Sequence, residues 1–466
     1  MLFPTVLATI AVFLASISEA LSFHPPYPQE SVDLDTPNRF LGNAGPFNEA
    51  IGYGIPADTP EECKIDQAHL FMREGARFPQ KGQVEDYAEL LETLKNSSIA
   101  VPGGPLAFAT DYELLDFNAT KYGRHISFDG IYSGSNEIHK LGAILRARYN
   151  HLVDESSTTP IFAAAAQKVY DTAQIFGDSF FFGGRAGDYK IFVFDEEESE
   201  TANTLTGAYS CPLYDDDTNE DLVESSKLDF DQWEADRFNR LSPGFNFTDD
   251  DVYTMFSYCA FELNAYGSSK FCDALSRDYL IGHSYQLDLN YFYTYGPGYN
   301  FSTVGGGLYV NATATMLKQG PEVAPPLTFS FTHETILLNY ITALGLLGDQ
   351  TTLDVDKVDF NRYFHASQAI PMGGRVVTER LSCTNHTSGK DESYVRILLN
   401  NKVTPLPGCN SGPGFSCPLD DYLDYVSNKT VRFADACHLN SSVPQDLSFY
   451  WDWETAKYST NYTFEY

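Results

Sequence analysis

The clearest pattern in the chain is a short apolar run followed by apolar residues at helical spacing. Residues 65–72 form a mostly apolar run, which predicts a buried strand. Five apolar residues then recur three or four positions apart, namely Val84, Tyr87, Ala88, Leu91 and Leu94. This spacing places them on one face of a helix. The first segment after the Pro-rich N-terminal region is therefore predicted to be a strand, a polar loop and a helix.

The same order of elements returns twice. A helix is predicted near 134–153, a strand at 160–166, and a helical stripe at Val169, Thr172, Ala173 and Phe176. Residues 327–332 then alternate like a strand, before a helix face made of Ile336, Leu337, Tyr340, Ile341 and Leu344. Strands that alternate with helices predict an α/β fold whose sheet contains parallel strands flanked by helices.

The middle of the chain has a different pattern. From about residue 182 to 307 the sequence contains the acidic runs DEEESE and YDDDTNED, followed by helical segments. One helix is predicted to begin at Thr248, which forms a capping box with Asp251. The acidic runs do not fit a twelve-residue calcium loop, so solvated loops are expected. We predict an α/β domain from 57–181 and 308–466, with 182–307 inserted as a mainly helical cap.

The first 20 residues, MLFPTVLATIAVFLASISEA, are apolar and end in small residues. This pattern predicts a secretory signal peptide, with Ser18 and Ala20 at suitable cleavage positions. A membrane anchor is the alternative, but the apolar stretch is short for one. No later segment reaches the roughly 18 apolar residues of a spanning helix, so no membrane partner is expected.

The charge balance excludes one large class of partners. The chain has 63 acidic and 30 basic residues, a formal net charge of −33. Such a surface repels nucleic acid and anionic membranes. A site for an anion must therefore be a local concentration of positive charge.

Cysteines and glycosylation motifs indicate export. The eight cysteines are an even set without a CxxC motif, which favours disulfides and gives no reason to expect a metal. Spacing alone leaves 105 pairings open. Nine Asn-x-Ser/Thr motifs occur, at Asn96, Asn118, Asn246, Asn300, Asn311, Asn385, Asn428, Asn440 and Asn461. We expect a secreted glycoprotein, located outside the cell or in the cell wall or periplasmic space.

Charged residues follow three of the predicted strands. Arg73, Glu74 and Arg77 lie in HLFMREGARFPQ after the first strand, Gln167 and Lys168 follow the second, and His333 and Glu334 follow the third. Ligands in such sheets bind at the carboxyl ends of strands. Three cations and a histidine around one point would hold a phosphoryl group. Ordinary surface ion pairs are the alternative interpretation, whereas HETIL lacks the second histidine of a zinc-protease HExxH motif.

These loops resemble the motifs of the histidine acid phosphatase family, in particular the secreted acid phosphatases and phytases of fungi. REGARFP is similar to RHGxRxP, with Glu74 in place of the histidine. LTFSFTHETILLNYITALGLL is similar to the later HD motif, with Glu334 in place of aspartate, and KVYDTAQIFG to RVxDTAxxF, with Lys168 in place of arginine. KFCDALSRDYLIGHSYQLDLNYFYTYGPGYN and PMGGRVVTERLSC also look like family segments, so the resemblance extends from about Cys63 to Cys437.

The resemblance implies a phosphoglycerate mutase-like α/β domain with a helical cap, no cofactor, and a small phosphate monoester as substrate. The family transfers the phosphoryl group to the motif histidine and then to water. Carried over, Arg73, Arg77, Lys168 and His333 bind phosphate, Glu334 occupies the proton-donor position, and Glu74 the nucleophile position. The implied disulfides are Cys63–Cys383, Cys211–Cys437, Cys259–Cys272 and Cys409–Cys417.

Glu74 changes what this site is expected to do. A carboxylate cannot form phosphohistidine, and an ionised Glu74 between two arginines repels a phosphate dianion. We therefore expect recognition of phosphate monoesters with hydrolysis at acid pH weakened or lost. Turnover through an acyl phosphate on Glu74 stays open, as does a non-catalytic structural or cell-wall glycoprotein. The sequence indicates neither the preferred ester nor the oligomeric state.

Overall fold

The computed structural model describes residues 37–464 except 97, 115–116, 183–187, 197–199, 386–388 and 461. The expected signal peptide at 1–20 lies outside the described residues. Within this part of the chain, no helix is both long enough and apolar enough to cross a bilayer.

A mixed eight-stranded sheet forms the centre of the fold. Four strands run parallel, namely β1 (Cys63–Arg73), β2 (Thr159–Ala164), β3 (Tyr189–Phe194) and β4 (Leu327–Thr332). The others pair antiparallel, namely β5 (Arg375–Asn385), β6 (Lys390–Leu399), β7 (Lys402–Val403) and β8 (Cys417–Pro418). The strand order is β3-β2-β4-β1-β5-β6-β7, with β8 on β6. This is the predicted fold class.

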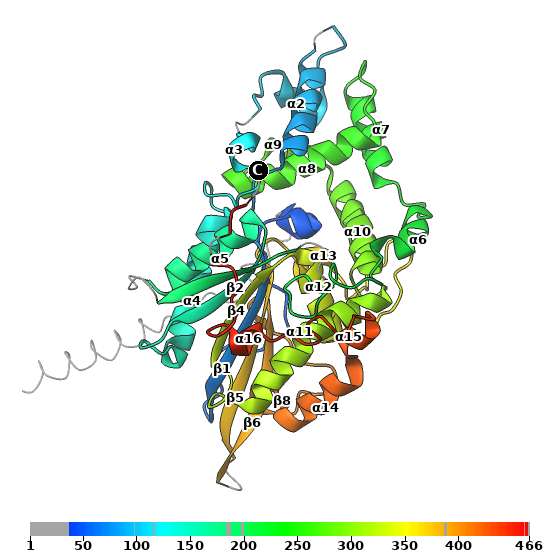
Figure 1. Cartoon of the computed structure of the whole chain (residues 1–466). Coiled ribbons are helices and arrows are strands. Elements are labelled where there is room, and N and C mark those ends of the chain that lie inside the picture. Colours follow the sequence, from blue (N-terminus) through cyan, green and yellow to red (C-terminus); the bar gives the residue numbers. More distant parts are fainter. Residues whose placement is uncertain are drawn as a thin grey trace, which may run out of the picture. The chain divides into compact units, whose positions relative to one another are not determined.

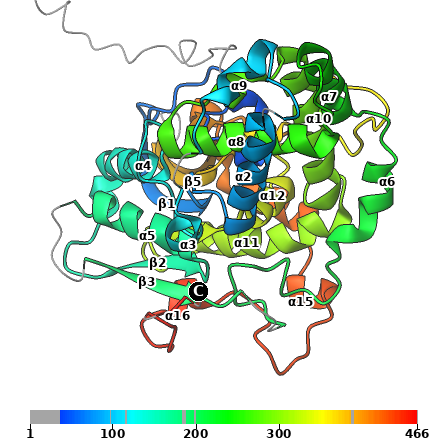
Figure 2. The same cartoon turned by 90° about the horizontal axis from the view of Figure 1, so that it is seen from above.

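Helices cover both faces of this sheet, as Figures 1 and 2 show. α4 (Gly134–Tyr149) and α5 (Gln167–Phe180) pack together on one face. α11 (Asn300–Gln319), α12 (Glu334–Ala343) and α14 (Leu419–Lys429) cover the other. β1 and β4 are consequently buried on both sides, and every residue of β4 is buried although its sequence, LTFSFT, alternates apolar residues with Thr and Ser.

A second group of helices lies above the sheet in Figure 1. Its members are α2 (Lys81–Lys95), α7 (Phe230–Leu241), α8 (Asp249–Tyr266), α9 (Lys270–Ala274) and the first turn of α10 (Arg277–Thr294). The predicted capping box is confirmed at the start of α8: the Asp251 backbone N–H donates to Thr248 Oγ1, and the Thr248 N–H donates to Asp251 Oδ2 at 2.8 Å. The remaining short α-helices are α3 (Ala119–Tyr122), α6 (Glu220–Glu224), α13 (Ala366–Ala369), α15 (Phe433–Ala436) and α16 (Phe449–Asp452).

The structure requires corrections to the predicted domain ranges. α11, which covers the sheet, begins at Asn300 inside the range 182–307. β3 lies within 182–307, yet it pairs with β2 and belongs to the sheet. α2 lies within 57–181, yet Tyr87 of α2 stacks on Tyr258 of α8 with ring centroids 4.6 Å apart, inside the cap cluster. Strand pairing decided the placement of β3, and aromatic packing decided that of α2. The division into an α/β domain and an inserted cap otherwise stays a prediction.

Four disulfide bonds connect these parts in the pairing that the resemblance implies. Cys63–Cys383 joins β1 to β5, and Cys211–Cys437 joins the segment before α6 to the end of α15. Cys259–Cys272 joins α8 to α9, and Cys409–Cys417 closes the loop before β8.

Candidate active site

The loop after β1 lies tightly against the first turn of α4. The Gly75 N–H donates to Thr172 Oγ1 of α5 at 3.1 Å. A Cβ atom on Gly134 would lie 2.2 Å from the Ala76 carbonyl oxygen, so only glycine permits this approach. The small residues at 75, 76 and 134 therefore hold Arg73, Glu74 and Arg77 at the carboxyl end of β1.

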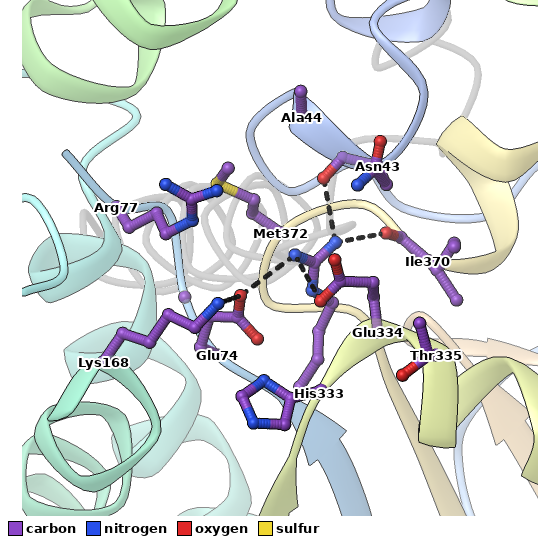
Figure 3. A network of polar contacts seen from close by, with 12 residues as sticks. Asn43, Ala44, Glu74, Arg77, Lys168, His333, Glu334, Thr335, Ile370 and Met372 are labelled. Carbon is purple, nitrogen blue, oxygen red and sulfur yellow. Dashed lines mark hydrogen bonds and ion pairs between the residues drawn. The ribbon is translucent and has the colours of Figure 1, made fainter. Parts of the chain in front are cut away.

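Arg73 is held on one side by backbone carbonyl oxygens and on the other by carboxylates (Figure 3). Its Nη1 donates to the carbonyl oxygens of Asn43 and Ile370, each at 2.8 Å. Its Nη2 lies 3.1 Å from Glu74 Oε1 and 3.2 Å from Glu334 Oε2. Burial disfavours the charged guanidinium, but Glu334 and Glu74 outweigh burial and raise the pKa of Arg73 above its ordinary value. Arg73 is a permanent buried cation with two carboxylate partners.

Glu74 is fully buried at the centre of this cluster. Its Oε1 lies 3.1 Å from both Arg73 Nη2 and Lys168 Nζ, whereas Oε2 has no hydrogen-bond partner among the described residues. Burial favours the neutral carboxyl, but the charges of Arg73, Lys168 and His333 outweigh it and hold the pKa of Glu74 well below its ordinary value. Glu74 is therefore ionised through most of the acid range.

Arg77 differs from Arg73 and Lys168 because no carboxylate pairs with it within the described part of the chain. Its Nη1 donates to the Phe78 carbonyl at 3.2 Å, and its guanidinium lies over the Phe261 ring at 4.9 Å. Burial lowers the pKa of Arg77, although the nearby charges of Glu74 and Glu334 partly offset this effect. Arg77 is thus the cation that an incoming anion can bind without displacing a carboxylate.

His333 lies immediately before α12 and has a partner that the sequence analysis missed. Its Nε2 lies 2.6 Å from Glu196 Oε1. Burial disfavours the imidazolium, but Glu196 and then Glu74 outweigh burial and raise the pKa of His333. Glu196 belongs to the acidic run DEEESE, for which the sequence predicts a solvated loop. The available signal was its position two residues beyond the end of β3, whose apolar residues Ile191 to Phe194 indicate a further strand.

Glu334, the first residue of α12, is more accessible than Glu74, with 19% of its side chain exposed. Burial favours its neutral form, but Arg73 outweighs burial and lowers the pKa of Glu334. In this arrangement Glu334 is an ionised partner of Arg73. To donate a proton it must first lose that ion pair.

The cluster also offers carboxylate and imidazole atoms to a metal. One ligand atom each from Glu74, His333 and Glu334 lies within 4.8 Å of the others. Arg73 and Lys168 already neutralise these carboxylates, and Glu196 contacts Nε2 of His333. A divalent cation would have to displace these ion pairs, which disfavours metal binding at the cluster.

The structure therefore brings the six candidate residues into one region. Arg73, Glu74, Lys168 and Glu334 form a connected ion-pair network, and the charges of His333 and Arg77 act on it. Gln167 is not part of it, because its side chain donates to Asp171 at 2.7 Å. The catalytic and binding roles of these residues stay predictions.

Comparisons with known proteins agree with this arrangement of motifs. The model of the histidine phosphatase superfamily (branch 2) matches residues 64–400. The chain belongs to this family. Acid phosphatase PHO1 of Komagataella pastoris is 40% identical over 465 residues, covering 96% of this chain and 97% of that protein. Phytase PHO112 of Candida albicans is 33% identical, covering 92% and 93%.

A solved structure shows the same fold over nearly the whole chain. The crystal structure of the phytase from D. castellii matches with a TM-score of 0.86 and 33% identity, covering 95% of this chain and 96% of that one. This histidine phosphatase family member therefore shares its fold with a phytase, and its relatives include acid phosphatases.

Proposed function

We propose that this protein is a secreted glycoprotein that binds phosphate monoesters at the Arg73, Arg77, Lys168 and His333 cluster, with hydrolysis at acid pH weakened or lost. The observation that carries the proposal is the position of Glu74. Its carboxylate lies 3.1 Å from Arg73 and from Lys168. A carboxylate thus takes the place of an anionic ligand in a site built from cations.

Binding is favoured by the number and placement of the positive charges. Arg77 has no carboxylate partner within the described residues, and His333 has a raised pKa that favours its charged form at acid pH. A phosphate monoester would contact these groups first and then compete with Glu74 and Glu334 for Arg73. Charge-assisted hydrogen bonds to phosphate are strong, so this competition permits binding, but at lower affinity than an uncontested site would give.

Hydrolysis is disfavoured by three substitutions that act on one reaction. Glu74 supplies no imidazole nucleophile, and its negative charge repels the incoming ester. Lys168 lacks the planar two-pronged donor of arginine. Glu334 is one methylene longer than aspartate, and a displacement of about 1 Å costs on the order of a hundredfold in rate. An acyl phosphate on Glu74 is the remaining route to turnover.

Secretion is supported by several independent features. The N-terminal 20 residues have the pattern of a signal peptide, and four disulfides require an oxidising compartment. Six of the nine glycosylation motifs have exposed asparagines in the structure, namely Asn96, Asn118, Asn246, Asn300, Asn428 and Asn440. We therefore propose an extracellular, cell-wall or periplasmic location. The alternative role, a structural cell-wall glycoprotein, needs no ligand at the cluster.

Two measurements on the purified secreted protein separate these functions. Release of p-nitrophenol from p-nitrophenyl phosphate at acid pH measures turnover, and the shift in melting temperature with inorganic phosphate measures binding. We expect stabilisation by phosphate, loss of that stabilisation in Arg77→Ala, and little or no release. Rapid release would contradict the loss of activity. If the protein neither hydrolyses p-nitrophenyl phosphate nor is stabilised by inorganic phosphate, the structural role is the one that remains.

A further inference from the structure

A hollow outside the candidate active site lies between α11 and residues 432–451, which we call the C-terminal segment. Its volume is about 410 Å³, within the range of small-ligand sites. Asn311, Thr315 and Gln319 line it from α11, and Gln445, Asp446 and Trp451 from the C-terminal segment. Figures 1 and 2 both place α15 and α16 of this segment alongside α11. The residues of α11 recur every four positions, so one helix face forms the wall.

The walls of the hollow combine a flat apolar surface with several polar groups. The Trp451 indole N–H donates to Gln319 Oε1 at 2.8 Å, which fixes the ring at the wall. Arg432 and Asp446 form an ion pair of 3.4 Å at the same hollow. A pyranose ring has an apolar C–H face and polar hydroxyl and acetamido groups at its edge. An indole surrounded by amide and charged groups matches both.

Asn311, which lines this hollow, is a candidate attachment site for an N-linked sugar. It begins an Asn-Ala-Thr motif within α11. Its side-chain amide lies 2.8 Å from Thr430 Oγ1, and the same hydroxyl lies 2.9 Å from the Val426 carbonyl oxygen. One end of the amide is thus held by Thr430, while the other end has no hydrogen bond within the described residues.

We propose that Asn311 carries an N-linked glycan whose first N-acetylglucosamine rests in this hollow against Trp451. The inference relies on the proposed secretion, because the sugar donor is a lipid-linked oligosaccharide diphosphate of the secretory pathway. The Asn311 Nδ2 forms the bond to C1 of the sugar and loses a proton. The C1–O bond to the lipid diphosphate breaks, and the diphosphate leaves with the electron pair.

The position of Thr313 fixes when this transfer occurs. Thr313, the third residue of the motif, is only 5% exposed in the folded chain. A transferase that must contact this threonine cannot reach it in the structure, so modification precedes the folding of α11. The sugar is then enclosed as the C-terminal segment packs, and it connects α11 to Trp451.

The test uses the protein secreted from a eukaryotic host. Glycopeptide mapping should find Asn311 occupied. Trimming every glycan to a single N-acetylglucosamine should leave the melting temperature unchanged. Asn311→Gln should lower the melting temperature by roughly 1–3 °C, whereas Asn300→Gln, which removes the exposed motif at the start of the same helix, should not. Trp451→Ala should lower it in the unaltered chain but have a smaller effect in the Asn311→Gln background, because the two groups act together.

Several outcomes would overturn the proposal. An unmodified Asn311 in a chain whose Asn300 and Asn428 are glycosylated would overturn it and leave secretion standing. If no motif is occupied, the proposed secretion fails as well. In protein made with N-glycosylation blocked, Asn311→Gln and the unaltered chain should melt together. A persisting difference would assign the effect to the lost hydrogen bond with Thr430 and reject the sugar.

Discussion

At the scale of single residues, the charge of Glu74 controls access to the cluster. Replacing Glu74 with Gln keeps the shape and removes the negative charge that occupies Arg73 and Lys168. We expect inorganic phosphate to bind on the order of tenfold more tightly, a gain of about 1.4 kcal/mol, still without turnover. Calorimetric titration of the variant and the unaltered protein at pH 5 measures this difference. An unchanged or weaker affinity would show that Glu74 does not compete with phosphate.

Replacing Glu74 with His tests the nucleophile position. Glu74→His should hydrolyse p-nitrophenyl phosphate measurably, at a rate limited by Lys168 and Glu334. Adding Lys168→Arg and Glu334→Asp should raise the rate by more than the sum of the separate gains, because the groups act as one unit. If the unaltered protein is already as fast and forms a base-labile, hydroxylamine-sensitive phosphoenzyme, Glu74 is itself the nucleophile.

The pair of Glu196 and His333 should make the phosphate affinity of the cluster depend on pH near neutrality. Glu196 helps raise the pKa of His333, so the charged imidazolium is fully present below about pH 6.5, the ordinary histidine value, and is lost as pH rises through the higher folded pKa. Phosphate affinity should fall over that upper range. In Glu196→Gln the fall should move to lower pH, whereas Glu200→Gln, an exposed member of the same acidic run, should leave it in place.

The residues of the cluster were predictable to different degrees. Arg73, Lys168 and His333 follow strands whose apolar runs are visible in the sequence, so their convergence follows from parallel pairing. Glu196 was missed because the strand before it, β3, directly precedes an acidic run that reads as a solvated loop. The ion pair of Glu334 with Arg73 could not be predicted from the sequence either, since it depends on side-chain positions across two strand ends.

At the scale of elements, the approach of the loop after β1 to α4 decides the position of the cations. Gly134→Ala places a Cβ 2.2 Å from the Ala76 carbonyl oxygen and must displace backbone. We expect a loss of about 1–3 kcal/mol in unfolding free energy together with weaker phosphate binding. Denaturant unfolding measures the first effect.

Gly82→Ala is the matched control for this prediction. Gly82 lies in the first turn of α2, and a Cβ there has no neighbour within 4 Å. Alanine should therefore leave stability unchanged or raise it by up to about 1 kcal/mol. Equal destabilisation by both variants would show that the approach at Gly134 has no special role.

The elements themselves followed closely from periodicity. Residues 327–332 are β4 as predicted, and the helical stripe from Val169 lies in α5. Periodicity did not predict which element each apolar helix face packs against. The apolar stripe of α2 is equally compatible with packing on the sheet or on another helix, and the aromatic contacts with α8 decide in favour of the cap.

At the scale of the whole molecule, α4 is joined to the antiparallel half of the sheet by one fully buried carboxylate. Glu379 of β5 accepts from Arg148 Nε of α4 at 2.6 Å, from Tyr149 Oη at 2.7 Å and from Arg396 Nη2 of β6 at 2.7 Å. Removing one member of a buried ionic network leaves the others uncompensated, which costs about 3–5 kcal/mol. Glu379→Gln should therefore strongly lower the unfolding free energy at pH 7.

The pH dependence of that loss distinguishes an ionic effect from a packing effect. Burial favours neutral Glu379, but Arg396 and Arg148 outweigh burial and lower its pKa. A carboxyl with a lowered folded pKa contributes stability above its unfolded pKa of about 4.3 and loses it as pH falls toward the folded value. The difference between Glu379→Gln and the unaltered protein should thus shrink below about pH 4.3. Glu85→Gln breaks an exposed pair with Lys81 at 3.6 Å and should cost less than about 0.5 kcal/mol at any pH. A Glu379→Gln penalty that stays constant down to pH 2.5 would mean that shape, and not charge, makes this carboxylate necessary.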